Sequence, residues 1–384
     1  MPEIIKNLLL YKNYRFFASF PSIVLLNGTQ NNEPQLLLLF RRARDSRWLL
    51  DEDNETHQKL KHLVDHIDSR SQITGIFFDC QLTPLTEAIP LSANPEAADQ
   101  DANLLLLRNG SLLLSSFSWY PVHAQLAEAL KGTGTRLYGH PDITGCHYLM
   151  WGGFTRLSHD QGKSWTEHNY LPQPPGAKAL IPDKRDYHGG PVRGQAIEVG
   201  NEILLPVYGT LNEDKVSSTY LYVSSDQGQH WSFRSVIARD PEQKLSFTEP
   251  ALLHIKDKTI MAFIRNTSGN DHFITALSTD SGQSWSQWQE SSLTGHPVHP
   301  LKLSDGRIFL SYGYRHKPYG IRAHLMDSKA EHLLGDEIII RDDGLCGDVG
   351  YPWAVELPNG NVLVVYYFTQ EDGVRHIAGS IVEL

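Results

Sequence analysis

Six residues at one repeated position include the sequence's clearest candidates for acid–base chemistry. The position lies nine residues before a residue of each predicted hairpin turn, and its occupants are Ser19, Asp101, Pro191, Glu249, Pro297 and Tyr351. Carboxylates and phenols are groups that transfer protons or attack electrophiles. If the six segments are equivalent repeats arranged around a central axis, the polar residues at this position converge at one end of the channel along that axis.

Arginines follow the second strand-like run in three of these copies. Arg41 and Arg42 follow LLLLF, Arg265 follows MAFI, and Arg315 follows LSYGY. Guanidinium groups bind carboxylates through paired hydrogen bonds. Successive residues of a strand point to opposite faces, so only one of Arg41 and Arg42 can face the channel. We therefore expect a local cationic pocket beside the reactive groups.

Hairpins predicted from turn dipeptides would position these side chains. Six pairs of apolar or β-branched runs flank a turn, at Asn27-Gly28, Asn109-Gly110, Gly200-Asn201, Asp257-Lys258, Asp305-Gly306 and Asn359-Gly360. Asn-Gly and Asp-Gly between such runs are strong hairpin signals because both turn residues need positive φ.

A second repeated signal is the pattern Ser-x-Asp-x-Gly-x-x-Trp. It occurs at residues 158–165, 224–231 and 278–285, each time after a strand-like run. The Ser and Asp side chains can bond backbone amides, the Gly can take positive φ, and the Trp can pack on the hairpin. Degenerate copies are expected at Asp79 and Asp327.

Together these signals predict an all-β fold: one six-bladed β-propeller domain of four-stranded blades over residues 1–384. From Asp79 to Asp327 the copies repeat about every 62 residues, so the chain holds about six of them. A β-sandwich is the alternative. Short helices are predicted in two insertions, at residues 51–66 and 123–131.

Composition narrows the function classes. The net charge is −10, which argues against a nucleic-acid partner. The sequence has no apolar run long enough to span a membrane, and we expect a cytoplasmic protein without a signal peptide. Three scattered cysteines form no metal knuckle. His57, His62 and His66 are interpreted as a solvated helix face rather than a metal site, so neither a metal nor an organic cofactor is expected. The oligomeric state is left open.

The three boxes on a propeller-like repeat resemble the sialidase superfamily, in which they are called Asp boxes or bacterial neuraminidase repeats. The resemblance covers nearly the whole chain. It implies an exo-acting, retaining glycoside hydrolase whose substrate carries a carboxylate on the anomeric carbon. Such enzymes use a Tyr nucleophile activated by a Glu, since a carboxylate nucleophile would be repelled by the substrate.

The resemblance also implies roles for individual residues. GYPWAVELPNG makes Tyr351 the nucleophile, and TEPALLHIKDKTIMAFIR makes Glu249 its base and Arg265 a carboxylate clamp. YGIRAHLMDS makes Arg322 the last clamp arginine, with Arg315 as competitor. HIDSRS resembles the loop of the acid/base residue, hence Asp68. Residues expected to line the sugar pocket are Asp101, Arg41 or Arg42, His188 and Arg193.

One departure from the family concerns the start of the first blade. Members of this superfamily typically begin with Arg-Ile-Pro, whose arginine is the first of three clamp arginines. The matching stretch here is Ser19-Phe20-Pro21, so that arginine is absent. Arg41, Arg42 or Arg193 are candidates to replace it. The substrate is expected to be a glycoconjugate or oligosaccharide ending in sialic acid, or in a relative such as Kdo. The alternative is a noncatalytic propeller that binds acidic glycans or a protein.

Overall fold

The structure is a computed structural model, described over residues 2–28, 33–45, 47–49, 53–55, 68–133, 135, 137–138, 146–177, 189–211 and 214–384. Most of the predicted 51–66 helix lies outside the described residues. His57, His62, His66 and the site candidate His188 lie outside them too.

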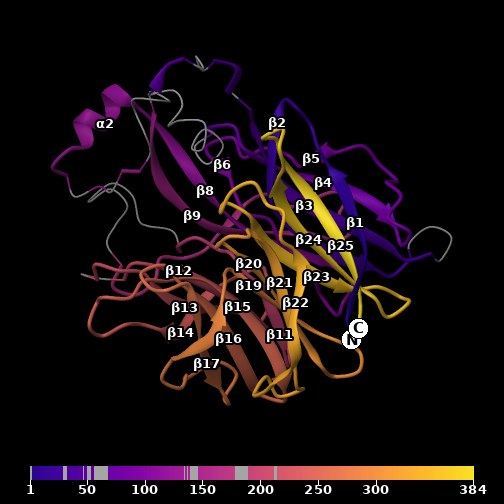
Figure 1. Cartoon of the computed structure of the whole chain (residues 1–384). Helices are drawn as coiled ribbons and strands as arrows, with labels where there is room; N and C mark the ends of the chain where they lie inside the picture. Colours follow the sequence, from indigo (N-terminus) through magenta and orange to yellow (C-terminus); the bar gives the residue numbers. More distant parts are fainter. Residues whose placement is uncertain are drawn as a thin grey trace.

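Six antiparallel sheets surround a central axis (Figure 1), which confirms the predicted six-bladed propeller of four-stranded blades. Blade 1 contains β2 (Phe16–Leu26), β3 (Gln35–Arg44), β4 (Gln72–Asp79) and β5 (Ile89–Pro90). A short 3₁₀ helix, η1 (Arg47–Leu49), lies in the connection between β3 and β4. Blade 2 contains β6 (Ala98–Asp99), β7 (Asn103–Leu106), β8 (Leu112–His123), β9 (Cys146–Ser158) and β10 (Asn169–Tyr170).

The next three blades follow the same order. Blade 3 contains β11 (Ile197–Val199), β12 (Glu202–Gly209), β13 (Ser218–Ser224) and β14 (Ser232–Ala238). Blade 4 contains β15 (Phe247–Lys256), β16 (Thr259–Asn266), β17 (His272–Ser278) and β18 (Gln289–Thr294). Blade 5 contains β19 (Val298–Lys302), β20 (Ile308–Tyr314), β21 (Gly320–Met326) and β22 (Leu333–Arg341).

Blade 6 closes the ring with both ends of the chain. Its strands are β23 (Gly350–Glu356), β24 (Val362–Thr369), β25 (Arg375–Glu383) and the N-terminal β1 (Glu3–Tyr11). β1 pairs with β25 from Glu3 opposite Glu383 to Tyr11 opposite Ile377, and the two termini lie side by side in Figure 1. This pairing ties the first residues to the last blade and covers the edge of β25.

The Ser-x-Asp-x-Gly-x-x-Trp turns have the predicted hydrogen bonds. In the first copy, Asp160 Oδ1 accepts from the Ser158 hydroxyl and the Ser164 amide, both at 2.8 Å. The degenerate copies use the same contact four residues on: Asp79 Oδ1 accepts from the Thr83 amide and Asp327 Oδ1 from the Glu331 amide.

Two of the box tryptophans also link neighbouring blades. Trp231 Nε1 donates to Thr155 Oγ1 in blade 2 at 3.0 Å, and Trp285 Nε1 donates to Ser235 Oγ in blade 3 at 3.1 Å. These two boxes therefore join their turns to the preceding blade, whereas Trp165 Nε1 donates within its own turn to the Gly162 carbonyl at 3.2 Å.

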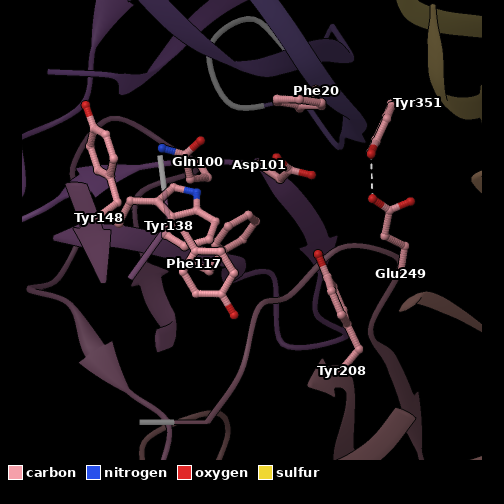
Figure 2. Close-up of a pocket in the computed structure, with 10 residues that line it drawn as sticks. Phe20, Gln100, Asp101, Phe117, Tyr138, Tyr148, Tyr208, Glu249 and Tyr351 are labelled. Carbon is pink, nitrogen blue, oxygen red and sulfur yellow. Dashed lines mark hydrogen bonds between the residues drawn. The ribbon is translucent and has the colours of Figure 1, made fainter. Parts of the chain in front are cut away.

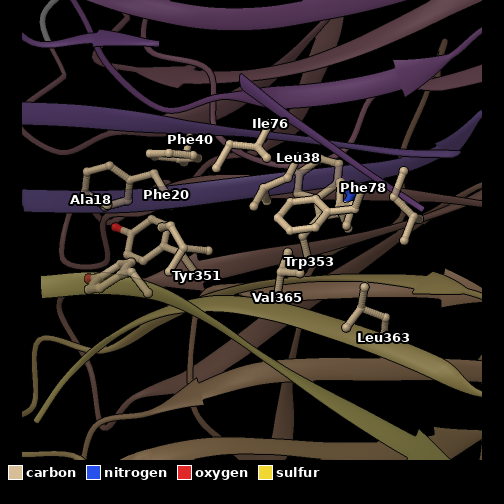
Figure 3. Close-up of a cluster of buried hydrophobic side chains, with 14 of the residues drawn as sticks. Ala18, Phe20, Leu38, Phe40, Ile76, Phe78, Tyr351, Trp353, Leu363 and Val365 are labelled. Carbon is tan, nitrogen blue, oxygen red and sulfur yellow. The ribbon is translucent and has the colours of Figure 1, made fainter. Parts of the chain in front are cut away.

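Apolar side chains fill the spaces between blades. Figure 3 shows the contact of blades 1 and 6, where Leu38 and Phe40 face Trp353 and Val365. Tyr351 belongs to this cluster, so its ring is held by packing while its hydroxyl donates to Glu249 of blade 4. A position fixed in this way keeps one rotamer, which suits a reactive group.

Blade 2 carries α2 (Ala124–Leu130), an α-helix that lies within the predicted 123–131 insertion. α2 follows β8, and β8 and β9 are the longest strands of the described chain. In Figure 1 these two strands run out toward α2 at the upper left of the view. No described helix is long and apolar enough to cross a membrane.

Candidate active site

The centre of the site is a hydrogen-bonded group of Tyr351, Glu249 and Arg265. The Tyr351 hydroxyl donates to Glu249 Oε1 at 2.5 Å, a bond drawn in Figure 2. Arg265 Nη1 donates to Glu249 Oε2 at 2.9 Å and to the Tyr351 hydroxyl at 3.2 Å. The sequence predicted this convergence of blades 4 and 6.

Backbone irregularities aim these side chains at the axis. Tyr351 and Glu249 have φ of 50° and 48°, and each lies at a register shift in the ladder between the first and second strands of its blade. Phe20 in blade 1 has φ of 54° at a similar shift. A bulge turns a side chain away from the regular alternation, and left-handed φ in a bulky residue is strain that clusters at functional sites. The corresponding residue of blade 1 is thus Phe20, one position after the predicted Ser19.

Electrostatics fix the resting protonation of this group. Burial disfavours the Glu249 carboxylate, but the Arg265 charge and the hydrogen bonds from Tyr351 and Arg265 outweigh it and lower the pKa of Glu249. Burial and the Glu249 charge raise the pKa of Tyr351 far above its ordinary value. At neutral pH the site therefore holds a carboxylate that accepts a hydrogen bond from a neutral phenol.

A cavity of about 290 Å³ opens beside the group. Aromatic side chains form most of its wall, with three carboxylate or amide residues among them; the full lining is Phe20, Gln100, Asp101, Phe117, Trp119, Tyr138, Tyr148, Tyr208, Glu249 and Tyr351. Figure 2 shows the Asp101 carboxylate directed toward Tyr351 and Glu249. Asp101 also lies 3.8 Å from Arg193 Nε. Sequence reasoning found three of these residues.

The aromatic wall was missed by the sequence analysis. Phe117 and Trp119 come from β8, and Trp119 packs edge-on against Tyr138 at 5.1 Å between ring centroids. A signal was present, because SSFSWY places two aromatic residues two apart in a predicted strand. Tyr208 lies at the end of β12 and had no comparable signal.

The neighbouring Arg41 and Arg42 point in different directions. Arg41 is completely buried, with its guanidinium carbon 5.9 Å from the Phe20 ring. Burial lowers its pKa to about 10, against the opposing charges of Asp68 and Asp101. Arg42 instead lies over the Phe16 ring at 4.2 Å. Arg41 is therefore the member of the pair beside the cavity.

Arg193 and Arg315 flank the Tyr351 ring, with guanidinium carbons 4.8 and 5.6 Å from its centroid. Arg193 supports the backbone: Nη2 donates to the Tyr351 carbonyl at 3.1 Å and Nη1 contacts Asn103 Oδ1 at 3.4 Å. Arg315 approaches Asp348 at 3.9 Å, and its Nε and Nη2 have no hydrogen-bond partner among the described residues. Arg315 thus has donors available for an anion.

Arg322, the clamp arginine expected from the resemblance, is not brought into this group. It lies on β21, and its guanidinium donates to the carbonyls of Arg341 and Pro318. It also stacks on Tyr314 at 4.8 Å and approaches Glu337. The third strand of a blade lies away from the axis, so the structure places Arg315, its competitor, beside Tyr351.

Asp68, expected as the acid/base, is engaged elsewhere. Its carboxylate accepts from the Arg44 amide at 2.5 Å, from Arg44 Nη2 at 3.1 Å and from the Arg70 amide at 2.8 Å. It is not among the described residues that line the cavity. These bonds make Asp68 a turn-stabilising ion-pair partner in this structure, and Asp101 is the aspartate on the cavity wall.

One group among the described residues has metal-ligand spacing: Asp327, Glu331 and His332. It belongs to the degenerate box of blade 5, and Asp327 Oδ1 already accepts the amide of Glu331. This turn is separate from the Tyr351 cavity.

Comparison with known proteins places this geometry in context. The model of a BNR repeat-like domain matches residues 119–364. No curated protein matches the sequence. A protein of unknown function from Dyadobacter fermentans is 31% identical, with a TM-score of 0.85, over 100% of this chain and 99% of that one.

Two sialidase structures share the fold at lower identity. A NanB sialidase variant from Streptococcus pneumoniae is 13% identical, with a TM-score of 0.63, over 98% of this chain and 70% of that one. A Trypanosoma rangeli sialidase, with 2,3-difluorosialic acid as a covalent intermediate, is 14% identical, with a TM-score of 0.61, over 99% and 59%. Together with the domain match, these structures support the predicted placement in the sialidase superfamily.

Proposed function

The chain belongs to the family of proteins with a BNR repeat-like domain, and from that premise we propose that it is an exo-acting, retaining glycoside hydrolase. Its substrate is an acidic-sugar glycoconjugate or oligosaccharide, from which it releases a terminal α-linked 2-keto-3-deoxy sugar acid of the sialic acid or Kdo type. The observation that carries the proposal is the buried Tyr351–Glu249 hydrogen bond with Arg265 attached to both residues.

The chemistry of the two residues follows from their charges. A ketosidic carbon that bears a carboxylate repels an anionic nucleophile, whereas the Tyr351 hydroxyl is neutral at rest. As its oxygen attacks the anomeric carbon, its proton passes to Glu249 over 2.5 Å, and the glycosyl–oxygen bond to the leaving group breaks. Water then cleaves the tyrosyl intermediate: the residue that protonated the leaving oxygen takes a proton from the water, and Glu249 returns its proton to Tyr351.

We assign the protonation of the leaving oxygen to Asp101 rather than Asp68. Asp101 is on the cavity wall and faces the Tyr351–Glu249 pair in Figure 2. Asp68 is held by Arg44 and Arg70. Replacing Asp101 by Asn should therefore lower turnover far more than replacing Asp68 by Asn, and the reverse order would return the acid/base role to Asp68.

The surroundings suit one terminal sugar acid. Arg265 and Arg315 lie beside Tyr351 and offer donors for a carboxylate. The aromatic wall offers apolar faces to the carbon-bound hydrogens of a sugar ring. A volume of about 290 Å³ is at the lower end for ligand pockets, which favours a single terminal residue over an internal stretch of glycan.

The test compares release from fluorogenic α-glycosides of sialic acid and of Kdo, with an uncharged α-glucoside as control. We expect release of one sugar acid and none from the glucoside. Tyr351→Phe should abolish turnover while binding stays measurable. Tyr312→Phe is the matched control, since the Tyr312 hydroxyl donates to Glu337 at 2.7 Å outside the cavity.

Three results would overturn the proposal. Full turnover by Tyr351→Phe refutes the nucleophile. Equal loss in Tyr312→Phe shows that the effect is structural. Binding of an acidic glycan without release of either sugar supports the alternative of a noncatalytic glycan-binding propeller.

A further inference from the structure

Two histidines and a carboxylate lie beside the arginines of the site and have no part in the chemistry above. His296 Nε2 is 3.0 Å from Asp271 Oδ1, and His316 Nε2 is 3.1 Å from Asp271 Oδ2. Asp271 belongs to the connection between β16 and β17, which follows Arg265, and His316 directly follows Arg315. The three residues thus connect blade 4 to blade 5 next to both arginines.

The hydrogen bond to Asp271 determines which nitrogen of His296 carries a hydrogen. A carboxylate is an acceptor, so Nε2 must be the donor. In the neutral ring Nδ1 is then a bare lone pair. Nδ1 is buried and has no hydrogen-bond partner among the described residues. His296 is only 3% exposed, and its backbone amide donates to Gly313 at 2.9 Å, so the ring is held in place.

The charges around His296 keep it neutral in the empty site. Burial, followed by the positive charges of Arg265 and Arg315, lowers its pKa to about 4. Asp271 and Glu249 act in the opposite direction but are outweighed. The same Arg265 has a buried Nε without a hydrogen-bond partner among the described residues. The site therefore contains guanidinium donors without a hydrogen-bond acceptor among the described residues, and a histidine whose protonation these positive charges disfavour.

A bound carboxylate reverses this balance. It cancels the field of the two guanidinium groups at His296, and an opposite charge at close range shifts a pKa by about 1–3 units toward the charged form. Phe20, the residue of blade 1 that corresponds to Glu249 and Tyr351, is apolar and brings no charge of its own.

We infer that His296 takes up a proton from solvent when the site binds a sugar carboxylate, and that it thereby becomes the third cation of the carboxylate-binding group with Arg265 and Arg315. The proton forms the Nδ1–H bond, and no bond of the sugar changes. The inference rests on the proposed function, because it requires a carboxylate ligand in this cavity.

The experiment measures binding of the 2,3-didehydro-2-deoxy acids of sialic acid and Kdo by calorimetry at pH 5 and pH 8. A rise of about 2 pKa units on binding makes the Kd about tenfold lower at pH 5 than at pH 8. In buffers of different ionisation enthalpy, the wild type should take up close to one proton per site near pH 5. The primary amide of the same sugar should take up none.

Three variants separate His296 from its neighbours. His296→Gln should bind with little dependence on pH and no proton uptake. Asp271→Asn removes the charge that favours protonation, so the uptake should shrink while the hydrogen bond can persist. His316→Gln is the matched control on the other oxygen of Asp271, and it should keep the wild-type pH dependence. Melting temperatures confirm that each variant is folded.

The outcomes distinguish this inference from the function on which it rests. If the wild type binds an acid with a Kd that does not change with pH, or if His296→Gln keeps the uptake, the inference fails and the proposed function stands. Loss of proton uptake in His316→Gln would show that His316, not His296, takes up the proton, and this result also overturns the inference. If the wild type neither binds nor releases either sugar acid, both fail.

Discussion

Neutralising Glu249 tests whether the reactive centre is held together by a buried ion pair. The Glu249 carboxylate is 8% exposed and accepts from both Tyr351 and Arg265. Glu249→Gln keeps the shape of the side chain, but its amide has one acceptor oxygen where the donors of Tyr351 and Arg265 converge. One of these two donors is therefore left without an acceptor. Removing one partner of a buried ion pair costs about 3–5 kcal/mol.

This cost converts to a measurable temperature. At roughly 2.1 cal/mol/K per residue, the unfolding entropy of 384 residues is about 0.8 kcal/mol/K, so Tm should fall by about 4–6 °C at pH 7. Glu337→Gln is the matched control, because Glu337 also accepts from a tyrosine, Tyr312, and approaches an arginine, Arg322. Its side chain is 39% exposed, so the loss should stay below about 1 kcal/mol.

The pH dependence gives the sign of the effect. The pKa of Glu249 is lowered in the folded state, because Arg265 and Tyr351 outweigh burial. The stabilisation by its carboxylate is therefore complete above its unfolded pKa, near about 4.3, and is lost as the pH falls through the folded pKa. Calorimetry from pH 7 downward should show the Tm gap between the wild type and Glu249→Gln constant above about pH 4.3 and narrowing steadily below it. Equal Tm losses in Glu249→Gln and Glu337→Gln at pH 7, or a gap that does not narrow below about pH 4.3, would refute the buried-pair reasoning.

Two further predictions concern the clamp and the turns. Arg315→Lys should raise KM about tenfold or more, because it loses the planar paired donors that contribute about 1.5–3 kcal/mol to binding a carboxylate. Arg322→Lys should leave KM unchanged. Steady-state kinetics on the released sugar measures both values, and equal rises in KM would contradict the assignment of Arg315. Asp280→Ala removes the acceptor of the hydrogen bonds from the Ser284 amide and the Ser278 hydroxyl. Tm should therefore fall by about 1–3 °C while kcat stays unaltered. A changed kcat would show that this turn contributes to the active site.

The fold was predictable because its signals are local. A turn at Asn359-Gly360 or a box at residues 224–231 is determined by φ preferences and side-chain-to-amide bonds within a few residues. Counting such signals gives the number of blades directly. The pairing of β1 with β25 was not predictable in this way, because no turn joins the two strands.

The clamp arginines show where local similarity stops being informative. Arg322 was favoured because the residues around it resemble a clamp segment, yet β21 is the third strand of its blade. Arg315 directly follows the second strand of blade 5, Arg265 lies near the end of the second strand of blade 4, and both lie beside Tyr351. The structure thus places the arginine at the equivalent position beside Tyr351 and the arginine of the similar segment on other partners, and the clamp roles of both stay predictions.

The same equivalence failed by one residue in blade 1, and the reason is in the backbone. Phe20, Glu249 and Tyr351 all adopt left-handed φ at a register shift, although none of these residue types favours it. Each such residue costs about 1–3 kcal/mol, so the surrounding strands must impose it. In blade 1 the shift lies between Ser19 and Ser22, which turns Phe20 rather than Ser19 to the cavity. Counting residues back from a turn locates a bulge, and only the ladder on both sides of it decides which side chain is turned toward the substrate.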